Sequence, residues 1–214
     1  MTKRKIFVVA LAICLVAIIS MGTLAWFNAN DEITNKFMIA DSDGDGTPDF
    51  KVDVFETDPE TGDKTQNGIT FEEIAPGDEL TKDPQVANLG DYDQWIRVYV
   101  TFDEWSVIEA ACNNQGISTD LSKWLTINDT TWIADGYTVD TQNDTISYVY
   151  YLNRKLTPGT SEILFKTVTI PGEFEQNDMT FASGDFSINI KAEALQADNT
   201  GATAQYAFAN YWGK

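Results

Sequence analysis

Two stretches of the chain alternate between apolar and polar residues, and this pattern constrains the possible fold more than any other feature. The first covers residues 95–102 and has Ile96, Val98, Val100 and Phe102 on one face. The second covers residues 186–194, and its apolar positions are Phe186, Ile188, Ile190, Ala192 and Ala194. A period of two is typical of β-strands that bury one face. We therefore expect two long strands, the second of them in the middle of a sheet.

Shorter strand-like stretches alternate with turn signals such as Asn67-Gly68, Pro76-Gly77 and Pro171-Gly172. The pattern predicts further strands over residues 32–40, 50–56, 69–74, 124–127, 131–133, 145–152 and 162–170. We expect a helix over residues 104–113, capped by Asp103 and ended by Gly116, and a short helix within residues 202–212. Many short strands with one helical insert indicate an all-β fold, a β-sandwich.

Aromatic residues are frequent in the expected strands. They include Tyr148, Tyr150, Tyr151, Trp95, Trp124 and Trp132. Such residues can form a surface for a glycan or a protein partner, but in strands they more often pack in the core or across neighbouring strands. We therefore predict core packing. Cys112 recurs with Trp105 and Ile108 at helical spacing, which likewise predicts a buried position rather than a reactive thiol.

The N-terminus has the charge and apolar order of an export signal. Three basic residues at positions 3–5 precede an uncharged apolar run over residues 6–19. Thr23 and Ala25 are small residues at positions −3 and −1 of a signal-peptidase cleavage site between Ala25 and Trp26. We predict a signal peptide over residues 1–25, an N-terminal arm over 26–40 and a β-sandwich domain over 41–214. The alternative is a retained membrane anchor, because uncharged residues continue to Phe27.

Charge and composition exclude several function classes. Removal of the predicted signal also removes its three basic residues. The remaining chain has 11 Lys and Arg against 33 Asp and Glu, a net charge of 11 − 33 = −22. Such a surface repels nucleic acid and anionic lipid, so we expect no nucleic-acid partner and membrane contact only through an uncleaved signal. The chain has no histidine, which excludes histidine-based triads and zinc motifs. Cys112 alone remains after signal removal, so no intramolecular disulfide can form.

The acidic loop at residues 41–49 carries the clearest chemical signal. Its oxygen donors alternate along the loop: Asp41, Asp43, Asp45, Thr47 through its carbonyl, and Asp49. With the turn at Gly46, this spacing wraps carboxylates around a hard cation, and calcium is the natural occupant. Position 12 is Val52 rather than the glutamate of an EF-hand. We predict a structural calcium site, with an acidic turn that binds nothing as the alternative.

Several motifs in order resemble one family. The segment Gly22-Thr-Leu-Ala-Trp-Phe27, followed by Ile33-Thr-Asn-Lys-Phe37, resembles the processing region of TasA/camelysin-type proteins, which are exported through a SipW-type signal peptidase. Pro76-Gly-Asp-Glu-Leu-Thr-Lys-Asp-Pro84 and Trp95-Ile-Arg-Val98 are similar to the family's run into its Val-Arg-Val strand, and Tyr150-Tyr-Leu-Asn-Arg-Lys-Leu-Thr-Pro-Gly159 is similar to a later block. Each motif is weak alone, but their order is fairly specific.

The resemblance implies a jelly-roll-like β-sandwich secreted to the cell surface or the biofilm matrix of a Gram-positive cell. It also implies fibres in which the arm of one subunit completes the sheet of the next, with other copies or related matrix proteins as partners. The expected donor-strand residues are Phe27, Ile33, Phe37 and Ile39.

Some camelysin relatives carry a metalloprotease label, which we do not extend to a chain without histidine. We therefore expect a non-enzymatic structural protein stabilised by calcium. The alternatives are a monomeric, anchored surface module that binds a glycan or a protein and, less favoured, a metalloprotease with a carboxylate-only metal site.

Overall fold

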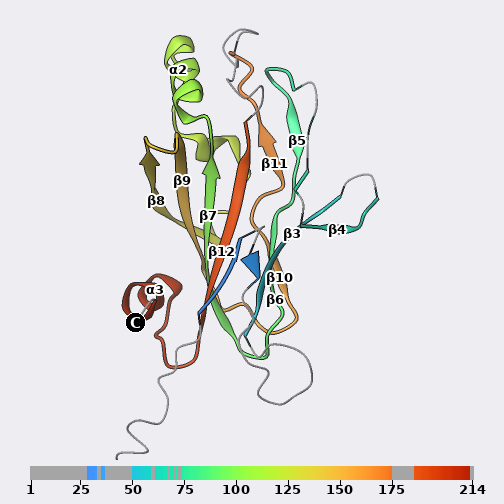
Figure 1. Ribbon diagram of the computed structural model, residues 1–214, viewed down its shortest axis with the longest axis vertical. Helices are drawn as coiled ribbons and strands as arrows, with labels where there is room; N and C mark the ends of the chain where they lie inside the picture. Colours follow the sequence, from blue (N-terminus) through green and yellow to red (C-terminus); the bar gives the residue numbers. More distant parts are fainter. Residues whose placement is uncertain are drawn as a thin grey trace, which may run out of the picture.

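The computed structural model describes residues 28–32, 35–36, 50–58, 61–66, 68–69, 71, 74–174 and 186–212, with residues 28–32 and 35–36 described by their backbone alone. Its largest sheet is antiparallel, in the order β2-β1-β12-β7-β9-β8. The bounds of these strands are Asn35–Lys36, Asn28–Glu32, Ile188–Gln196, Gln94–Phe102, Thr145–Leu152 and Trp132–Asp140. The mostly antiparallel strands confirm the predicted all-β sandwich (Figure 1).

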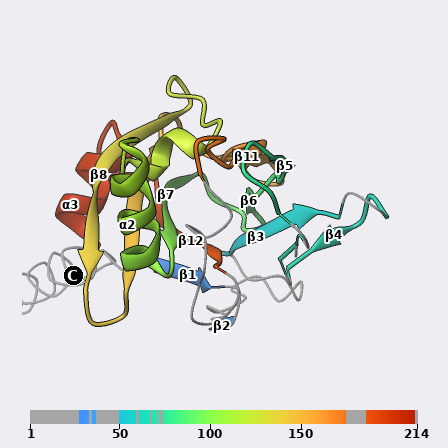
Figure 2. The same ribbon diagram turned by 90° about the horizontal axis from the view of Figure 1, so that it is seen from above.

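A second sheet has the order β10-β6-β3-β4, and β11 and β5 form a separate pair. The strand bounds are Ser161–Ile163 for β10, Gln85–Asn88 for β6, Val52–Thr57 for β3, Lys64–Thr65 for β4, Thr167–Thr169 for β11 and Glu79–Thr81 for β5. Seen from above, β3 and β6 lie across from β12 and β7, so the two sheets enclose a common core (Figure 2). The predicted strand over residues 50–56 corresponds to β3.

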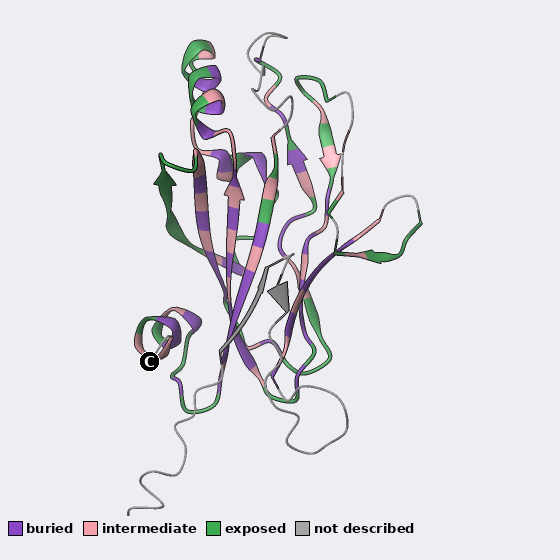
Figure 3. Ribbon diagram, viewed as in Figure 1, coloured by how far each residue is buried: buried purple, intermediate pink, exposed green. Residues whose placement is uncertain are grey.

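The core lies between the inner faces of these sheets. Ile96, Val98, Val100 and Phe102 of β7 are 0% exposed, as their alternation predicted. They pack with residues of β12 and with Val52 of β3 in one apolar cluster. β12 lies between β1 and β7, so its predicted place inside a sheet is confirmed. Figure 3 shows buried residues along β7, β9 and β12.

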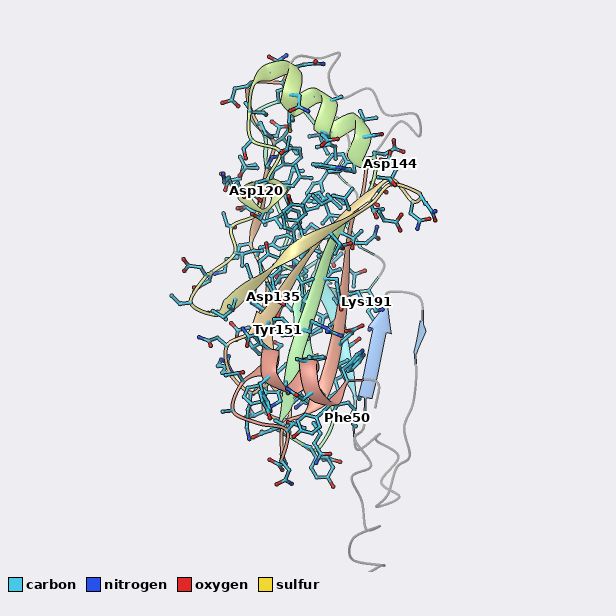
Figure 4. All side chains as sticks on the ribbon, turned by 90° about the vertical axis from the view of Figure 1, so that its left-hand side faces the viewer. Phe50, Asp120, Asp135, Asp144, Tyr151 and Lys191 are labelled. Atoms are coloured by element: carbon cyan, nitrogen blue, oxygen red, sulfur yellow. The ribbon has the colours of Figure 1, made fainter. Side chains whose placement is uncertain are left out.

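The helical insert is confirmed as α2, Trp105–Gln115, but its predicted cap is wrong. Glu104 precedes the helix in a left-handed conformation and makes no side-chain cap, while Asp103 accepts hydrogen bonds from Ser187. The free amide of Ser106 instead donates to Asp144 Oδ1 at 2.8 Å. Figure 4 shows Asp144 beside the start of α2. This cap comes from the loop before β9, which local sequence cannot identify.

The other features predicted for this region are confirmed. Gly116 ends α2 with a φ of 67°, a conformation that glycine adopts without strain. Cys112 is fully buried. The six aromatic residues named in the sequence are also buried in the apolar clusters rather than gathered on the surface. The expected C-terminal helix is present as α3, Ala204–Tyr211.

Three strand predictions differ from the structure. The strand expected over residues 124–127 is wrong, because Asp120 accepts from Ser122 and starts a 3₁₀ helix, η1, Leu121–Trp124. The single strand expected over 162–170 is two strands, β10 and β11, which pair with β6 and β5 respectively. Of residues 69–74, those that are described lie outside any strand.

Strand β8 is longer than the three residues expected for it. Its side chains from residue 134 onward are exposed on both faces, so no apolar alternation marks them in the sequence (Figure 3). The predicted strand over 145–152 coincides with β9, whose pairing with β8 extends that edge strand.

Tyr148 and Tyr150 bring two phenol groups into the core from β9. Burial raises the pKa of Tyr148 and, with the charge of Asp120 adding to it, raises the pKa of Tyr150 to about 12. The Tyr148 hydroxyl also accepts a hydrogen bond from the Leu121 amide at 2.8 Å, which ties η1 to the sheet. The folded protein therefore keeps both phenols protonated at pH values that ionise an unfolded tyrosine.

We expect the free energy of unfolding to fall as pH rises from about 10 towards 12. The folded-state pKa of Tyr150 is raised, so its contribution is complete below the unfolded pKa and is lost on approaching the folded one. Urea unfolding at pH 8, 10 and 11 should show a smaller loss for Tyr150→Phe than for the wild type. Tyr206→Phe, at a side chain 53% exposed on α3, is the control. Equal pH dependence in all three proteins would contradict this assignment.

Candidate functional site

The described part of the N-terminal arm is a strand of the largest sheet. β1 pairs antiparallel with β12, from Asn28 opposite Leu195 to Asp31 opposite Ala192. β2 follows and pairs with β1 through Lys36 opposite Asp31 and Asn35 opposite Glu32. The single strand predicted over residues 32–40 is wrong for the residues that are described there: Glu32 ends β1, while Asn35 and Lys36 form β2, which pairs antiparallel with β1. Figure 1 shows β1 running alongside β12.

Strand β12 offers two edges, and β7 occupies one of them through nine residue pairs. β1 covers part of the other edge. Without β1, the backbone groups of residues 192–195 on that edge would lose their partners, and unpaired backbone groups readily accept an extended strand. The inner side chains of this stretch, Ala192 and Ala194, are fully buried. The edge of β12 is therefore a strand-binding site that the chain fills with its own arm.

A buried ion pair links the outer face of β12 to that of β7. Arg97 of β7 lies directly opposite Glu193 of β12, and Arg97 Nε donates to Glu193 Oε2 at 2.8 Å. Their side chains are 14% and 7% exposed. The ion pair thus joins β12 to β7 through side chains in addition to the backbone ladder.

Helix α3 covers this ion pair. The Arg97 guanidinium lies 4.4 Å from the ring centre of Phe208 and 5.3 Å from that of Trp212. Tyr151 of β9 packs against Phe208 from below, with ring centres 5.8 Å apart. Cation–π contacts strengthen as water is excluded. Helix α3 therefore shields the Arg97 guanidinium from water, and the contact with this charge stabilises the packing of α3 on the sheet. Figure 4 shows α3 lying across the sheet beside Tyr151.

The electrostatics of this cluster favour the charged form of Arg97. Burial lowers the pKa of Arg97, but hydrogen bonds to Glu193 and Tyr151 and the charge of Glu193 raise it by more, so the net direction is upward. The pKa of Tyr99, next along the outer face of β7, is raised by burial and by the charge of Glu193. Arg97 therefore remains a cation, and its partner carboxylate is charge-balanced.

The site residues predicted from the sequence all fall outside the described residues. They are the cleavage residues Ala25 and Trp26, the donor residues Phe27, Ile33, Phe37 and Ile39, and the loop ligands Asp41, Asp43, Asp45, Thr47 and Asp49. These remain predictions. Within the described ranges, no three His, Cys, Asp or Glu side chains gather closely enough to hold a metal ion.

Sequence reasoning missed the Arg97–Glu193 pair and its cover by α3. The alternation of β7 places Arg97 and Tyr99 opposite the core, and that face reads as solvent-exposed when the strand is considered alone. The aromatic run near the C-terminus, which includes Phe208 and Trp212, is the sequence signal that the C-terminal segment packs on the outer face of β7. In the described part of the chain, no helix is both long and apolar enough to cross a bilayer.

Comparison with known proteins gives one family. A family model described as camelysin metallo-endopeptidase matches residues 1–147. This match covers the arm and the chain through β8 and into β9. A search of curated proteins found no match.

We expect Arg97→Met to lower the free energy of unfolding by about 3 kcal/mol, because the buried Glu193 loses the guanidinium and keeps only Lys191, whose Nζ lies 3.5 Å from Glu193 Oε1. The double variant Arg97→Met with Glu193→Met should recover most of this loss, since it removes both charges. Arg154→Met is the matched control. Arg154 is 54% exposed in its ion pair with Glu162, and its loss should cost less than about 1 kcal/mol. Equal costs for Arg97→Met and Arg154→Met in urea unfolding would contradict a stabilising role for the buried pair.

Proposed function

The chain belongs to the camelysin metallo-endopeptidase family, and we propose that it is a secreted, non-enzymatic structural protein of the cell surface or biofilm matrix. In this proposal the signal peptide over residues 1–25 is removed by a signal peptidase between Ala25 and Trp26. Mature subunits then join head to tail by strand exchange, with the arm of one copy on β12 of the next. The partners are other copies of the chain or related matrix proteins.

The pairing of β1 with β12 carries this proposal. The arm adds to β12 through a backbone ladder, and a ladder can form equally well with the same strand of a second copy. Exchange of an identical element keeps the contacts and changes only which subunit supplies them. Each subunit would insert its arm into one neighbour and accept the arm of another neighbour on its own β12. Such contacts are head to tail, and they build a fibre when the rotation between successive subunits does not close into a ring.

One observation supports a non-enzymatic role despite the family's descriptive name. The full sequence contains no histidine, and catalytic zinc sites normally draw on histidine. A zinc peptidase centre of the usual histidine-containing type therefore has no ligand set in this sequence.

Calcium binding by residues 41–49 completes the proposal. The loop follows the arm directly in the sequence and carries four aspartates at alternating or near-alternating positions. Calcium tolerates six to eight oxygen ligands in irregular geometry, which suits such a loop. A cation there would fix the chain at the point where the arm leaves the domain and would offset part of the strong negative charge.

The alternative function is a monomeric surface module that binds a glycan or a protein. The observation that favours it is the same pairing, because β1 completes the sheet within a single chain. The two functions differ in whose arm occupies β12, and this can be measured directly.

Disulfide trapping distinguishes the two arrangements. Ala29 lies opposite Ala194 in the β1–β12 register, a spacing that a disulfide can bridge. A mature chain with Ala29→Cys is mixed with one carrying Ala194→Cys, both with Cys112→Ala. We expect a covalent dimer on oxidation, because the two cysteines meet only when one copy's arm enters the other. Non-reducing electrophoresis and mass spectrometry identify the product.

The control pairs Ala29→Cys with Ala134→Cys, a residue on the exposed strand β8 at the opposite edge of the sheet. Cross-linking at the control rate would mean that the Ala29–Ala194 product reflects random collision. If the mixed Ala29 and Ala194 variants stay uncoupled while the double variant forms an intrachain disulfide, the chain is a self-completed monomer and the matrix-subunit proposal fails.

Replacing Asp43 and Asp45 with asparagine should abolish calcium binding, since each replacement removes a charged ligand. Isothermal titration calorimetry with calcium is expected to show binding to the wild type and none to Asp43→Asn/Asp45→Asn. Asp129→Asn/Asp135→Asn, at two exposed positions outside the loop, makes the same charge change and should leave binding intact. Binding that survives in the loop variant would place calcium elsewhere.

A further inference from the structure

We propose that Lys191 of β12 is the residue that sets the register of the bound arm, by pairing with the carboxylate at arm position 32. This inference rests on the proposed strand exchange for its role between subunits. The same pairing operates when the arm is bound within one chain. The partner selected is an extended strand with a carboxylate opposite Lys191, and the arm of a second copy satisfies this condition.

The outer face of β12 presents a fixed charge pattern to the arm. Lys191 and Glu193 lie two residues apart on this face, with Lys191 Nζ 3.5 Å from Glu193 Oε1. Glu193 is already engaged by Arg97 and is buried. The Lys191 side chain is 35% exposed, whereas that of Glu193 is 7% exposed. Figure 4 shows Lys191 between β12 and β1.

The backbone register relates these charges to the arm. Asn30 lies opposite Glu193 and Asp31 opposite Ala192, so one further antiparallel step places residue 32 opposite Lys191. Residue 32 is a glutamate, and residue 30 is a neutral asparagine. The native register therefore matches a carboxylate with the lysine and sets no carboxylate opposite Glu193. Opposite charges on directly facing residues stabilise an antiparallel pair.

Alternative registers lose this match. A slip by one residue moves every side chain of the arm to the other face of the sheet. A slip by two residues in one direction places Glu32 opposite Glu193, where two carboxylates would meet in a buried setting. A slip by two in the other direction places Asn30 opposite Lys191, which leaves the lysine facing a neutral residue. Lys191 and Glu193 together therefore discriminate against the nearest slipped registers.

Reciprocal charge reversal tests the pairing in the mature chain, residues 26–214. Lys191→Glu sets two carboxylates opposite each other, and Glu32→Lys sets two lysines opposite each other. Each variant alone should show an oligomer-forming equilibrium weakened about five- to tenfold. An equimolar mixture should assemble like the wild type, because the arm of either variant then meets the opposite charge on β12 of the other. Size-exclusion chromatography with light scattering measures the oligomer fraction.

Lys123→Glu and Glu109→Lys make the same charge changes at exposed positions on η1 and α2 and should assemble like the wild type, alone or mixed. If the wild type assembles and the mixture of Lys191→Glu with Glu32→Lys does no better than either variant alone, the charge pairing is overturned and strand exchange stands.

If the wild type stays monomeric, the strand-exchange proposal fails, and the pairing is then judged within one chain. Intrachain disulfide formation between Ala29→Cys and Ala194→Cys should slow with Lys191→Glu and recover when Glu32→Lys is added. Rates that are unaffected by either charge reversal would overturn the register role of Lys191.

Discussion

The structure depends on β12 and its two neighbours. On one side β12 forms a nine-residue ladder with β7, and the two strands bury their inner faces together against the second sheet. On the other side it pairs with an arm from the opposite end of the chain. An uncovered strand edge presents unpaired backbone groups, and the arm supplies partners for those on the second edge of β12. The proposed strand exchange would cover this edge with the arm of a neighbouring copy.

The outer face of the same strand shows how the protein keeps β12 in place. The Arg97–Glu193 pair and the aromatic side chains of α3 tie it to β7 independently of the arm. Attachment of β12 to β7 that does not involve the arm is what a receptor for an exchanged arm would require. Lys191 lies two residues before Glu193 on the same face of β12, and in the proposed register it stands opposite arm position 32.

The strong negative charge limits how copies of the chain can associate, and the absence of histidine limits the chemistry that the chain can perform. A chain with a net charge of −19 repels its own copies, so association needs a specific ladder, a matched charge or a bound cation to succeed. Family membership fits a secreted matrix protein, and the lack of histidine removes the usual ligands of a catalytic zinc ion. The family's descriptive name therefore does not extend by itself to the chemistry of this chain.

The sequence by itself determined the fold class, the buried faces of β7 and β12, the position of α2 and the C-terminal helix, because alternation and turn chemistry are local signals. It misassigned the cap of α2, the 3₁₀ helix at Leu121–Trp124 and the split between β10 and β11. It also gave no register for the arm. These features depend on residues that meet only after folding: Asp144 is 38 residues from Ser106, and Glu193 is 96 from Arg97. Only the tertiary structure decided that the arm lies on β12, since strand pairing between the two ends of a chain leaves no mark in either segment alone.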